Sequence, residues 1–246
     1  MLQTVLIKNT GAKIFLVVCC DASDFFVLSR KPFYMSRICL LIILSMIALA
    51  GCKKDNPEPD RCKDCIRVYK PNIYLYPLKV TSLHVGLSFP LGGNVVVSIP
   101  QYNNGWNVNV APSGRIDDKY DYLFYESDQP DKWQKKTGWV VKRDSLEHFF
   151  EADMKACQFR DNEIKDFIDY WIPRLNDAPY YAIYPQEKPV IEKLIQLHFS
   201  EQPDNVLRLF YVVKALNKPV QLKPHDKTTP VSREGFNVAE WGVILE

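Results

Sequence analysis

Beyond residue 65, apolar and polar positions alternate with a period of two. In segment 79–90, Leu83 and Val85 fall on one side and His84 on the other, as in a half-buried strand. The same pattern predicts strands at 66–77, 94–100, 106–112, 120–126 and 138–142, with glycine, asparagine and proline between them. Short strands at this spacing indicate an antiparallel sheet, either a sandwich or a strongly twisted meander.

The spacing becomes helical after Asp144. A first helix is predicted there, with Asp144 as N-cap and Glu147 at the capping-box position. A second helix should begin near Asp161 and kink or end at Pro173. Strand patterns return at 180–185, 206–216 and 235–245, whereas 190–199 fits either period. The order of strands, two helices and strands predicts an α+β fold, antiparallel and β-rich, with a helical pair inserted between strands.

One apolar stretch, "ICLLIILSMIALA" at 38–50, has neither period and no charge. It is shorter than the roughly 20 residues that a membrane-spanning helix needs. Arg37 lies ahead of it and small residues end it, which is the pattern of an export signal. The alternative is a buried apolar helix, and the missing amphipathic period argues against it.

The signal ends in "LAGC" at 49–52, which resembles the lipobox of bacterial lipoproteins. The resemblance implies that Cys52 receives a diacylglycerol and becomes the first residue of the mature protein. Because Lys53 rather than aspartate follows Cys52, the resemblance implies the outer membrane, at its periplasmic face or the cell surface. Two or three acyl chains are sufficient for stable anchoring to a membrane.

These features divide the chain into four parts. Residues 1–34 are interpreted as an upstream extension produced by a start codon placed too early, and residues 35–51 as the signal peptide. Residues 52–61 are charged and contain prolines, so they form a lipidated tether. Residues 62–246 are expected to form a single α+β domain.

Seven cysteines occur in the chain, and the close pair Cys62 and Cys65 suits a local disulfide in an exported protein. Free or differently paired thiols, or a metal or redox site, are the alternatives. Cys157 lies on the predicted helix stripe and is interpreted as a buried small apolar residue.

Composition and motifs exclude some classes of function. The formal net charge is +2, which gives no electrostatic argument for nucleic-acid binding, since that calls for a strongly basic face. No metal-ligand spacing and no serine-nucleophile motif occurs in the sequence, so we expect no metal and no cofactor. His148 and His225 are both interpreted as solvent-exposed. Glycoside cleavage uses paired carboxylates, and the acids available for it are Glu126, Asp128, Asp131 and Glu240. Glu240 stands out because it precedes Trp241 inside an apolar block.

Aromatic residues make up 13% of the chain and give its binding signal. Tyr74 and Tyr76 are two residues apart on one predicted strand, so they face the same way. With Trp106 and Glu126 they are the candidate ligand-binding residues, as a stacking surface for a glycan. The alternative is that the rings cover a core.

Five stretches in order resemble a family of exported bacterial proteins with no established activity: "KPNIYLYP" (70–77), "YNNGWNVNVAPSG" (102–114), "YLFYE" (122–126), "DFIDYWIPRL" (166–175) and "PDNVLRLF" (203–210). The resemblance implies that residues 66–246 form one unit, and it brings no catalytic residue. We therefore expect a lipid-anchored cell-envelope protein that binds a glycan or another envelope protein without catalysis. The alternative is an envelope hydrolase acting on polysaccharide or peptide.

Overall fold

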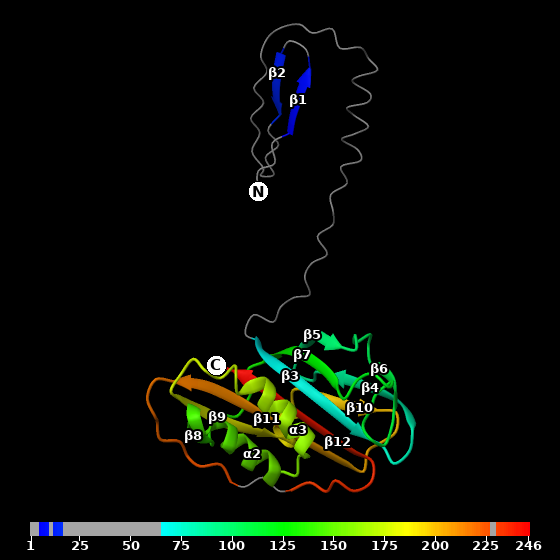
Figure 1. The fold of residues 1–246 in the computed structure, drawn as a ribbon, viewed down its shortest axis with the longest axis vertical. Helices are drawn as coiled ribbons and strands as arrows, with labels where there is room; N and C mark the ends of the chain where they lie inside the picture. Colours follow the sequence, from blue (N-terminus) through cyan, green and yellow to red (C-terminus); the bar gives the residue numbers. More distant parts are fainter. Residues whose placement is uncertain (1–4, 10–11, 17–64, 227–229) are drawn as a thin grey trace. The chain divides into compact units, whose positions relative to one another are not determined.

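The computed structural model describes residues 5–9, 12–16, 65–226 and 230–246. The chain divides into two compact units, Met1–Asn56 and Pro57–Glu246. In the first unit, β1 (Val5–Asn9) pairs antiparallel with β2 (Ala12–Leu16). The second unit holds the remaining described elements (Figure 1).

The second unit is built on a seven-stranded sheet of order β5-β7-β3-β12-β11-β9-β8 and a three-stranded sheet of order β10-β4-β6. The large sheet contains β3 (Cys65–Tyr76), β5 (Asn94–Ile99), β7 (Leu123–Pro130), β8 (Trp139–Lys142), β9 (Tyr180–Glu187), β11 (Asn205–Leu216) and β12 (Asn237–Leu245). The small sheet contains β4 (Thr81–Ser88), β6 (Trp106–Val110) and β10 (Gln196–Phe199). The helical elements are η1 (Arg143–Ser145), α2 (Leu146–Ala156), α3 (Asp161–Trp171) and α4 (Lys188–Ile191).

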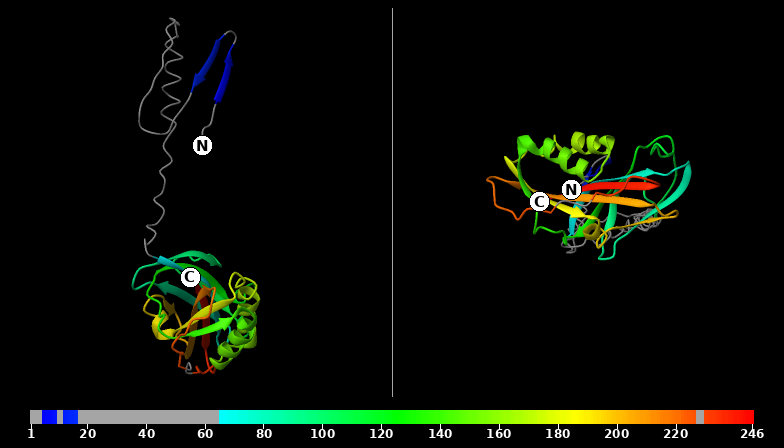
Figure 2. Two further views of the ribbon diagram at one scale, coloured as in Figure 1. Left: turned by 90° about the vertical axis from the view of Figure 1, so that its left-hand side faces the viewer. Right: turned by 90° about the horizontal axis from the view of Figure 1, so that it is seen from below.

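The two faces of the large sheet have different covers. Helices α2 and α3 lie together on one face (Figure 2, right). Their apolar stripes, including Phe150 and Phe167, pack there against Trp241 of β12 in one core cluster. On the opposite face, residues of the small sheet such as Leu83 and Val108 join a second core cluster with Val238. Because it is covered on both faces, β12 is buried over all but its last residue.

The predicted fold class is confirmed: the protein is α+β, β-rich and mainly antiparallel, with a helical pair between β8 and β9. One pairing was not predicted, because β11 and β12 run parallel in the middle of the large sheet. Parallel neighbours need a crossover connection, and residues 217–236 provide it. This connection also brings His225 and Arg233 to the helical side of the unit, where they contact Glu187 and Glu163.

The start of the first helix differs from the prediction. Asp144 lies inside η1, and Ser145 is the N-cap of α2 without a side-chain capping bond. A short 3-10 turn therefore replaces the predicted capping box at Asp144. The second helix begins at Asp161 as predicted, and it ends at Trp171, two residues before Pro173. The ambiguous segment 190–199 divides between the end of α4 and β10.

A bulge interrupts β3 at Lys70 and Pro71. The register with β7 shifts between Val68 and Asn72, and the register with β12 shifts opposite the same residues. As a result Val68 faces the small sheet, whereas Tyr74, also at an even position, faces the helices. A bulge adds a residue and so reverses the alternation of a strand. It also accommodates Pro71, which has no backbone N–H to donate within a central strand.

Candidate functional site

The predicted aromatic surface is part of the core. Tyr74 and Tyr76 are 1% and 5% exposed and pack in the cluster beneath the helices. The Tyr74 ring lies edge-on to Tyr122, with centroids 5.4 Å apart, and its hydroxyl donates to Asp166 Oδ2 over 2.9 Å. The Arg160 guanidinium covers the Tyr76 ring at 3.8 Å. The alternative weighed for these rings, that they cover a core, is the arrangement found.

Trp106 and Glu126 do not join them. Trp106 is 2% exposed, belongs to the other core cluster, and donates from Nε1 to the carbonyl of Pro100 over 2.8 Å. Glu126 lies on β7, where its Oε2 is 3.6 Å from Arg67 Nη1. Since the tyrosines and the tryptophan lie on opposite faces of the large sheet, the four predicted residues do not form one open site.

Of the cysteines predicted to be functional, one is described. Cys65 begins β3 and is disulfide-bonded. Cys52 and Cys62 lie outside the described residues, so lipidation of Cys52 and the Cys62–Cys65 pairing stay predictions. Cys157 is buried at the C-cap of α2, as expected.

The acid singled out by its apolar neighbours, Glu240, is fully buried. Both carboxylate oxygens are engaged, since Tyr125 donates to Oε1 over 2.8 Å and Arg208 donates to Oε2 over 2.5 Å. With no exposed surface, Glu240 cannot reach a substrate. The assignment of Glu240 to a hydrolytic site is therefore wrong in this fold, because the carboxylate belongs to a core ion pair.

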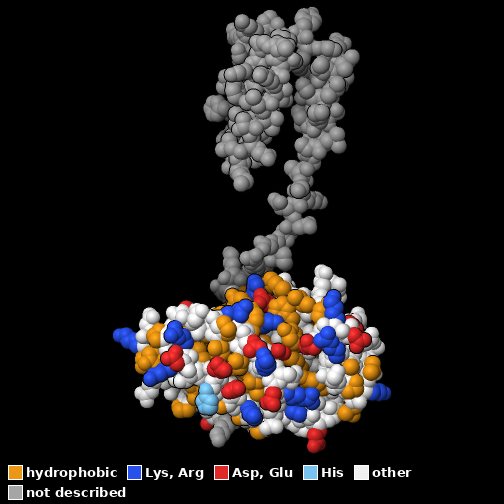
Figure 3. All heavy atoms as spheres, in the orientation of Figure 1, with side chains coloured by type: hydrophobic (Ala, Val, Ile, Leu, Met, Phe, Trp, Pro, Cys, Tyr) orange, Lys and Arg blue, Asp and Glu red, His pale blue; other side chains and the backbone are white. Residues whose placement is uncertain are grey.

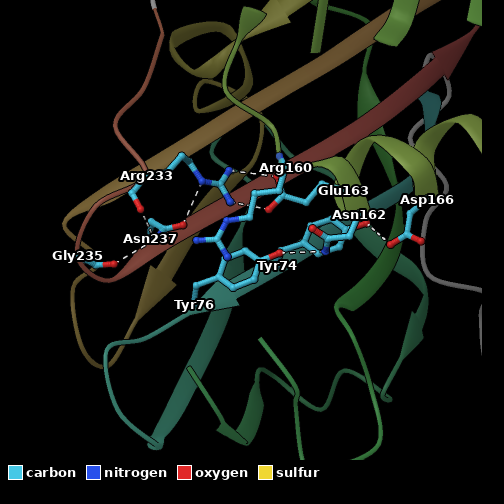
Figure 4. Close-up of polar contacts among 9 residues, drawn as sticks. All are labelled: Tyr74, Tyr76, Arg160, Asn162, Glu163, Asp166, Arg233, Gly235 and Asn237. Carbon is cyan, nitrogen blue, oxygen red and sulfur yellow. Dashed lines mark hydrogen bonds and ion pairs between the residues drawn. The ribbon is translucent and has the colours of Figure 1, made fainter. Parts of the chain in front are cut away.

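A second buried acid ties the crossover connection to a helix (Figure 4). Glu163 of α3 is buried, and Arg233 Nη2 donates to its Oε1 over 2.5 Å. Glu163 Oε2 also accepts from the backbone N–H of Arg160 over 2.8 Å, which caps the helix. Arg233 Nε in turn donates to Asn237 Oδ1 at the start of β12 over 3.1 Å. All these partners are satisfied within the fold, so the cluster is structural.

A cleft of about 1000 Å³ lies beside α2. We call it the α2 cleft; its lining residues are Trp139, Val141, Ser145, His148, Phe149, Ala152, Asp153, Ala156, Cys157, His225 and Pro230. Its walls are mostly apolar, with a few polar side chains among them, which is the usual make-up of a ligand site.

Aromatic rings form one wall of the α2 cleft. Trp139 of β8 meets Phe149 of α2 edge to face with centroids 5.3 Å apart, and it meets His225 in the same way at 5.5 Å. Phe149 continues to Phe150 in the core beneath. Trp139 and Phe149 are half-buried, so each ring is held by packing yet keeps surface toward the cleft.

His225 is fixed in the cleft by two partners, Thr137 just before β8 and Glu187 at the end of β9. One ring nitrogen lies 2.9 Å from Thr137 Oγ1, and the other lies 3.1 Å from Glu187 Oε1. The backbone near it is held because Gly138 N–H donates to the carbonyl of Lys223 over 3.0 Å. The interpretation of His225 as an exposed loop residue is therefore wrong, since the crossover connection folds it against β8 and β9. His148, by contrast, is exposed as expected.

Asp153 is the acid of the cleft lining. It lies on α2, and Tyr211 of β11 donates to its Oδ2 over 2.7 Å. Burial raises the pKa of the Asp153 carboxyl, and the bond from Tyr211 opposes this rise in pKa only in part. A carboxyl with a raised pKa at a cleft wall can donate as well as accept a proton.

The surface around the helices is of mixed charge. In Figure 3, lysine and arginine alternate with aspartate and glutamate over the visible face, without a large area of one sign. Within the described ranges, no three histidine, cysteine or acidic side chains gather as a metal site would require. No helix in the part of the chain that the structure describes has the length and apolar character to cross a membrane.

The α2 cleft was not predicted from the sequence because its lining comes from two stretches that are far apart in the chain, 139–157 and 225–230. Trp139 begins the short strand β8, directly after Gly138. Strand β9 passes so close to Gly138 that a Cβ there would lie 2.3 Å from the carbonyl oxygen of Ile183, so only glycine fits. The available signal was Asp153, a carboxylate on the apolar stripe of the first helix between Phe150 and Cys157. No protein-family model, curated protein or solved structure matches this chain.

Proposed function

We propose that this protein is a lipid-anchored cell-envelope protein that binds a glycan in the α2 cleft. A glycan is proposed as the ligand because Trp139 and Phe149 form a wall of the cleft, with Asp153 and His148 also in its lining. Half-buried aromatic rings offer flat apolar surface against which the C–H face of a sugar can pack. Neighbouring charged and polar side chains supply acceptors and donors for its hydroxyl groups.

The shape of the site favours a glycan over a folded protein partner. Protein interfaces bury about 800 Å² on each partner over a broad surface, whereas this site is a cleft of about 1000 Å³ beside one helix. A chain of a few sugar residues fits such a volume. No cofactor or metal is part of the proposal.

The location rests on the sequence alone. A lipid on Cys52 followed by a charged tether would hold the domain at the outer membrane. Replacing Cys52 with serine should abolish labelling by radioactive or alkyne-tagged palmitate and release the protein from the membrane fraction. A Lys53→Ala variant, which keeps the cysteine, is the control and should stay labelled. Labelling that persists in the Cys52→Ser variant would contradict the anchor.

Binding can be tested with the full-length chain in mild detergent on an array of bacterial and host polysaccharides. We expect Trp139→Ala to weaken binding by several-fold to about tenfold, since an aromatic contact is worth about 0.5–1.5 kcal/mol beyond the area it buries and about 1.4 kcal/mol corresponds to a factor of ten. Phe89→Ala removes another half-buried ring outside the cleft and should leave affinity unchanged. The proposal would be overturned if no glycan bound, or if Trp139→Ala and Phe89→Ala lost affinity equally. Binding of a protein in place of a glycan would make a protein the ligand.

Asp153 gives one observation in favour of the alternative, an envelope hydrolase. A general acid needs a raised pKa and access to substrate, and Asp153 has the raised pKa and lines the α2 cleft. Glycosidases use a second carboxyl within about 10 Å, and Glu187, which contacts His225 and whose charge contributes to the raised pKa of Asp153, is a candidate. New reducing ends released by the wild type and lost in Asp153→Asn would establish hydrolysis, whereas unchanged polysaccharide would leave binding as the function.

A further inference from the structure

A second site lies at the bulge of β3, away from the α2 cleft. Lys70 has a positive φ of 56°, a conformation that costs a side-chain-bearing residue about 1 kcal/mol or more. The bulge at Lys70 and Pro71 directs the Lys70 side chain out of the ladder toward Tyr170 of α3. Bulges are used in this way to aim a side chain at a site.

Aromatic rings surround the Lys70 amine. Its Nζ lies 4.4 Å from the centroid of Phe124, 4.7 Å from Tyr122 and 5.4 Å from Tyr170. Tyr122 and Phe124 come from the start of β7 and the residue before it, and Tyr170 comes from α3, so two segments distant in sequence converge on one amine. The rings exclude water from much of the side chain.

The hydrogen-bond partners of the amine are neutral. Nζ lies 3.3 Å from Asn72 Oδ1 and 3.3 Å from the Tyr122 hydroxyl. Within the described residues no carboxylate forms an ion pair with Lys70, and Asp166 instead accepts from Tyr74. A lysine ammonium has three N–H donors, so these two neutral partners do not use all of its hydrogen-bonding capacity.

Burial favours the neutral amine. It is the main cause that lowers the pKa of Lys70 to about 8; the charges of Asp166 and Glu126 oppose this fall in pKa, and the positive charge of Arg174 contributes to it to a smaller extent. Arg174 is held nearby because its guanidinium stacks on the Tyr170 ring at 3.8 Å. Desolvation in an apolar pocket and a neighbouring cation are two ways in which proteins activate a lysine as a nucleophile, and burial is the larger of the two at Lys70.

The Lys70 side chain lines a cavity of about 340 Å³. The cavity is lined by Lys70, Ile99, Lys119, Tyr120, Asp121, Tyr122, Phe124 and Tyr170. It is large enough for a molecule of a few carbon atoms. Lys119, whose Nζ lies 4.9 Å from the Tyr120 ring centroid, supplies a positive charge at the same opening. The acid of the lining, Asp121, is paired with Arg115 over 2.5 Å, so the Lys119 charge favours a ligand carrying a carboxylate.

From this geometry we infer that Lys70 is a reactive amine that forms an imine with a small carbonyl compound, an aldehyde or ketone bearing a carboxylate. This function goes beyond glycan binding and does not depend on it. The Lys70 nitrogen attacks the carbonyl carbon, and the carbonyl oxygen leaves as water with the two hydrogens of the amine. No oxidant or reductant takes part. Tyr122 is placed to donate a proton to the departing oxygen and to recover one from nitrogen.

The test is site-resolved trapping in the full-length chain. The protein is incubated with glyoxylate and sodium cyanoborohydride at pH 7.5, and the modification of each lysine is followed by peptide mass spectrometry. A pKa of about 8 in place of 10.5 raises the neutral fraction of the amine roughly two-hundredfold at this pH. The lower nucleophilicity of a weaker base offsets part of this gain. We therefore expect Lys70 to react at least ten times faster than the exposed Lys136.

Two variants separate chemistry from folding. Lys70→Arg keeps a cationic side chain and should abolish the fast modification at position 70. Tyr122→Phe should slow the modification of Lys70 severalfold and leave the circular dichroism spectrum unchanged. Propanal, which lacks the carboxylate, should react more slowly at Lys70 than glyoxylate does. Modification of Lys70 at the rate of Lys136 in the wild type would overturn the proposal, whatever the variants do. Glycan binding measured on the same samples should not change, so the two proposals fail independently.

Discussion

Arg208 and Glu240 lie directly opposite each other on the parallel strands β11 and β12, and Arg208 Nε donates to Glu240 Oε2 over 2.5 Å. Both side chains are fully buried in the space between the two sheets. Arg208 also donates from Nη1 to the carbonyl of Ile195 over 2.7 Å. A shift of one residue between these strands would move one charge to the other face of the sheet. The pair therefore favours a single register for the parallel strands at the centre of the fold.

Glu240→Gln should be strongly destabilising, because it leaves the Arg208 charge buried without its partner. We expect a loss of about 3–5 kcal/mol in the free energy of unfolding, measured by urea titration followed by tryptophan fluorescence. Asp169→Asn breaks a solvent-exposed pair with Lys165 on α3 and should not shift the midpoint. If Glu240→Gln shifted the midpoint no more than Asp169→Asn does, the register role of the pair would be untenable.

Glu163→Gln should weaken the attachment of the crossover connection to α3. Glu163 accepts from both Arg233 and the Arg160 backbone, and removal of one partner of a buried ion pair costs about 3 kcal/mol or more. Glu147 also lies in the first turn of a helix but faces solvent, so Glu147→Gln is the matched control. Hydrogen exchange of residues 230–236 should rise in the Glu163 variant alone. Equal exchange in both variants would contradict this role.

Local patterns could be predicted from the sequence where a strand or helix has one uninterrupted period. In β4, Leu83 and Val85 are buried and His84 is exposed, as the alternation indicates. In α3, Ile164, Phe167 and Trp171 form the buried stripe. Each of these results depends only on which face meets a core, and that is encoded within about ten residues.

Long-range relationships could not be predicted in this way. The bulge at Lys70 reverses the alternation of β3, and its sequence offers only a proline as a sign. His225 is 38 residues from Glu187 in sequence, and the loop composition around it resembles that of any exposed turn. Glu240 could be marked as unusual within an apolar block, but its partner Arg208 depends on a parallel pairing that no local pattern reveals.

Gly114 should tolerate alanine less well than Gly92 does. Both have a left-handed backbone, with φ of +91° and +87°, which costs alanine about 1 kcal/mol. At Gly114 a Cβ would lie 2.7 Å from Cε1 of the buried Tyr76 ring, whereas at Gly92 it would meet nothing within 4 Å. Overpacking adds about 1–3 kcal/mol. In urea titrations the free energy of unfolding of Gly114→Ala should therefore be well below that of Gly92→Ala. Equal free energies of unfolding would show that the Tyr76 ring moves aside freely.

Asp153→Asn should change how stability depends on pH. The folded-state pKa of Asp153 is raised above its ordinary value of 3.8, so near the folded pKa the folded state binds more protons than the unfolded state. The Asp153 contribution therefore lowers stability at neutral pH, and this loss is recovered as pH falls through the folded pKa toward 3.8.

Asparagine stays neutral and can still accept from Tyr211. The variant should therefore be at least as stable as the wild type at pH 7, and its advantage should shrink as the pH is lowered toward 3.8. Urea midpoints of both proteins measured from pH 4 to 7 test this, with Asp144→Asn, an exposed aspartate next to α2, as control. An advantage that stays constant with pH would mean that Asp153 titrates normally, and it would remove the support for a proton-donating acid in the α2 cleft.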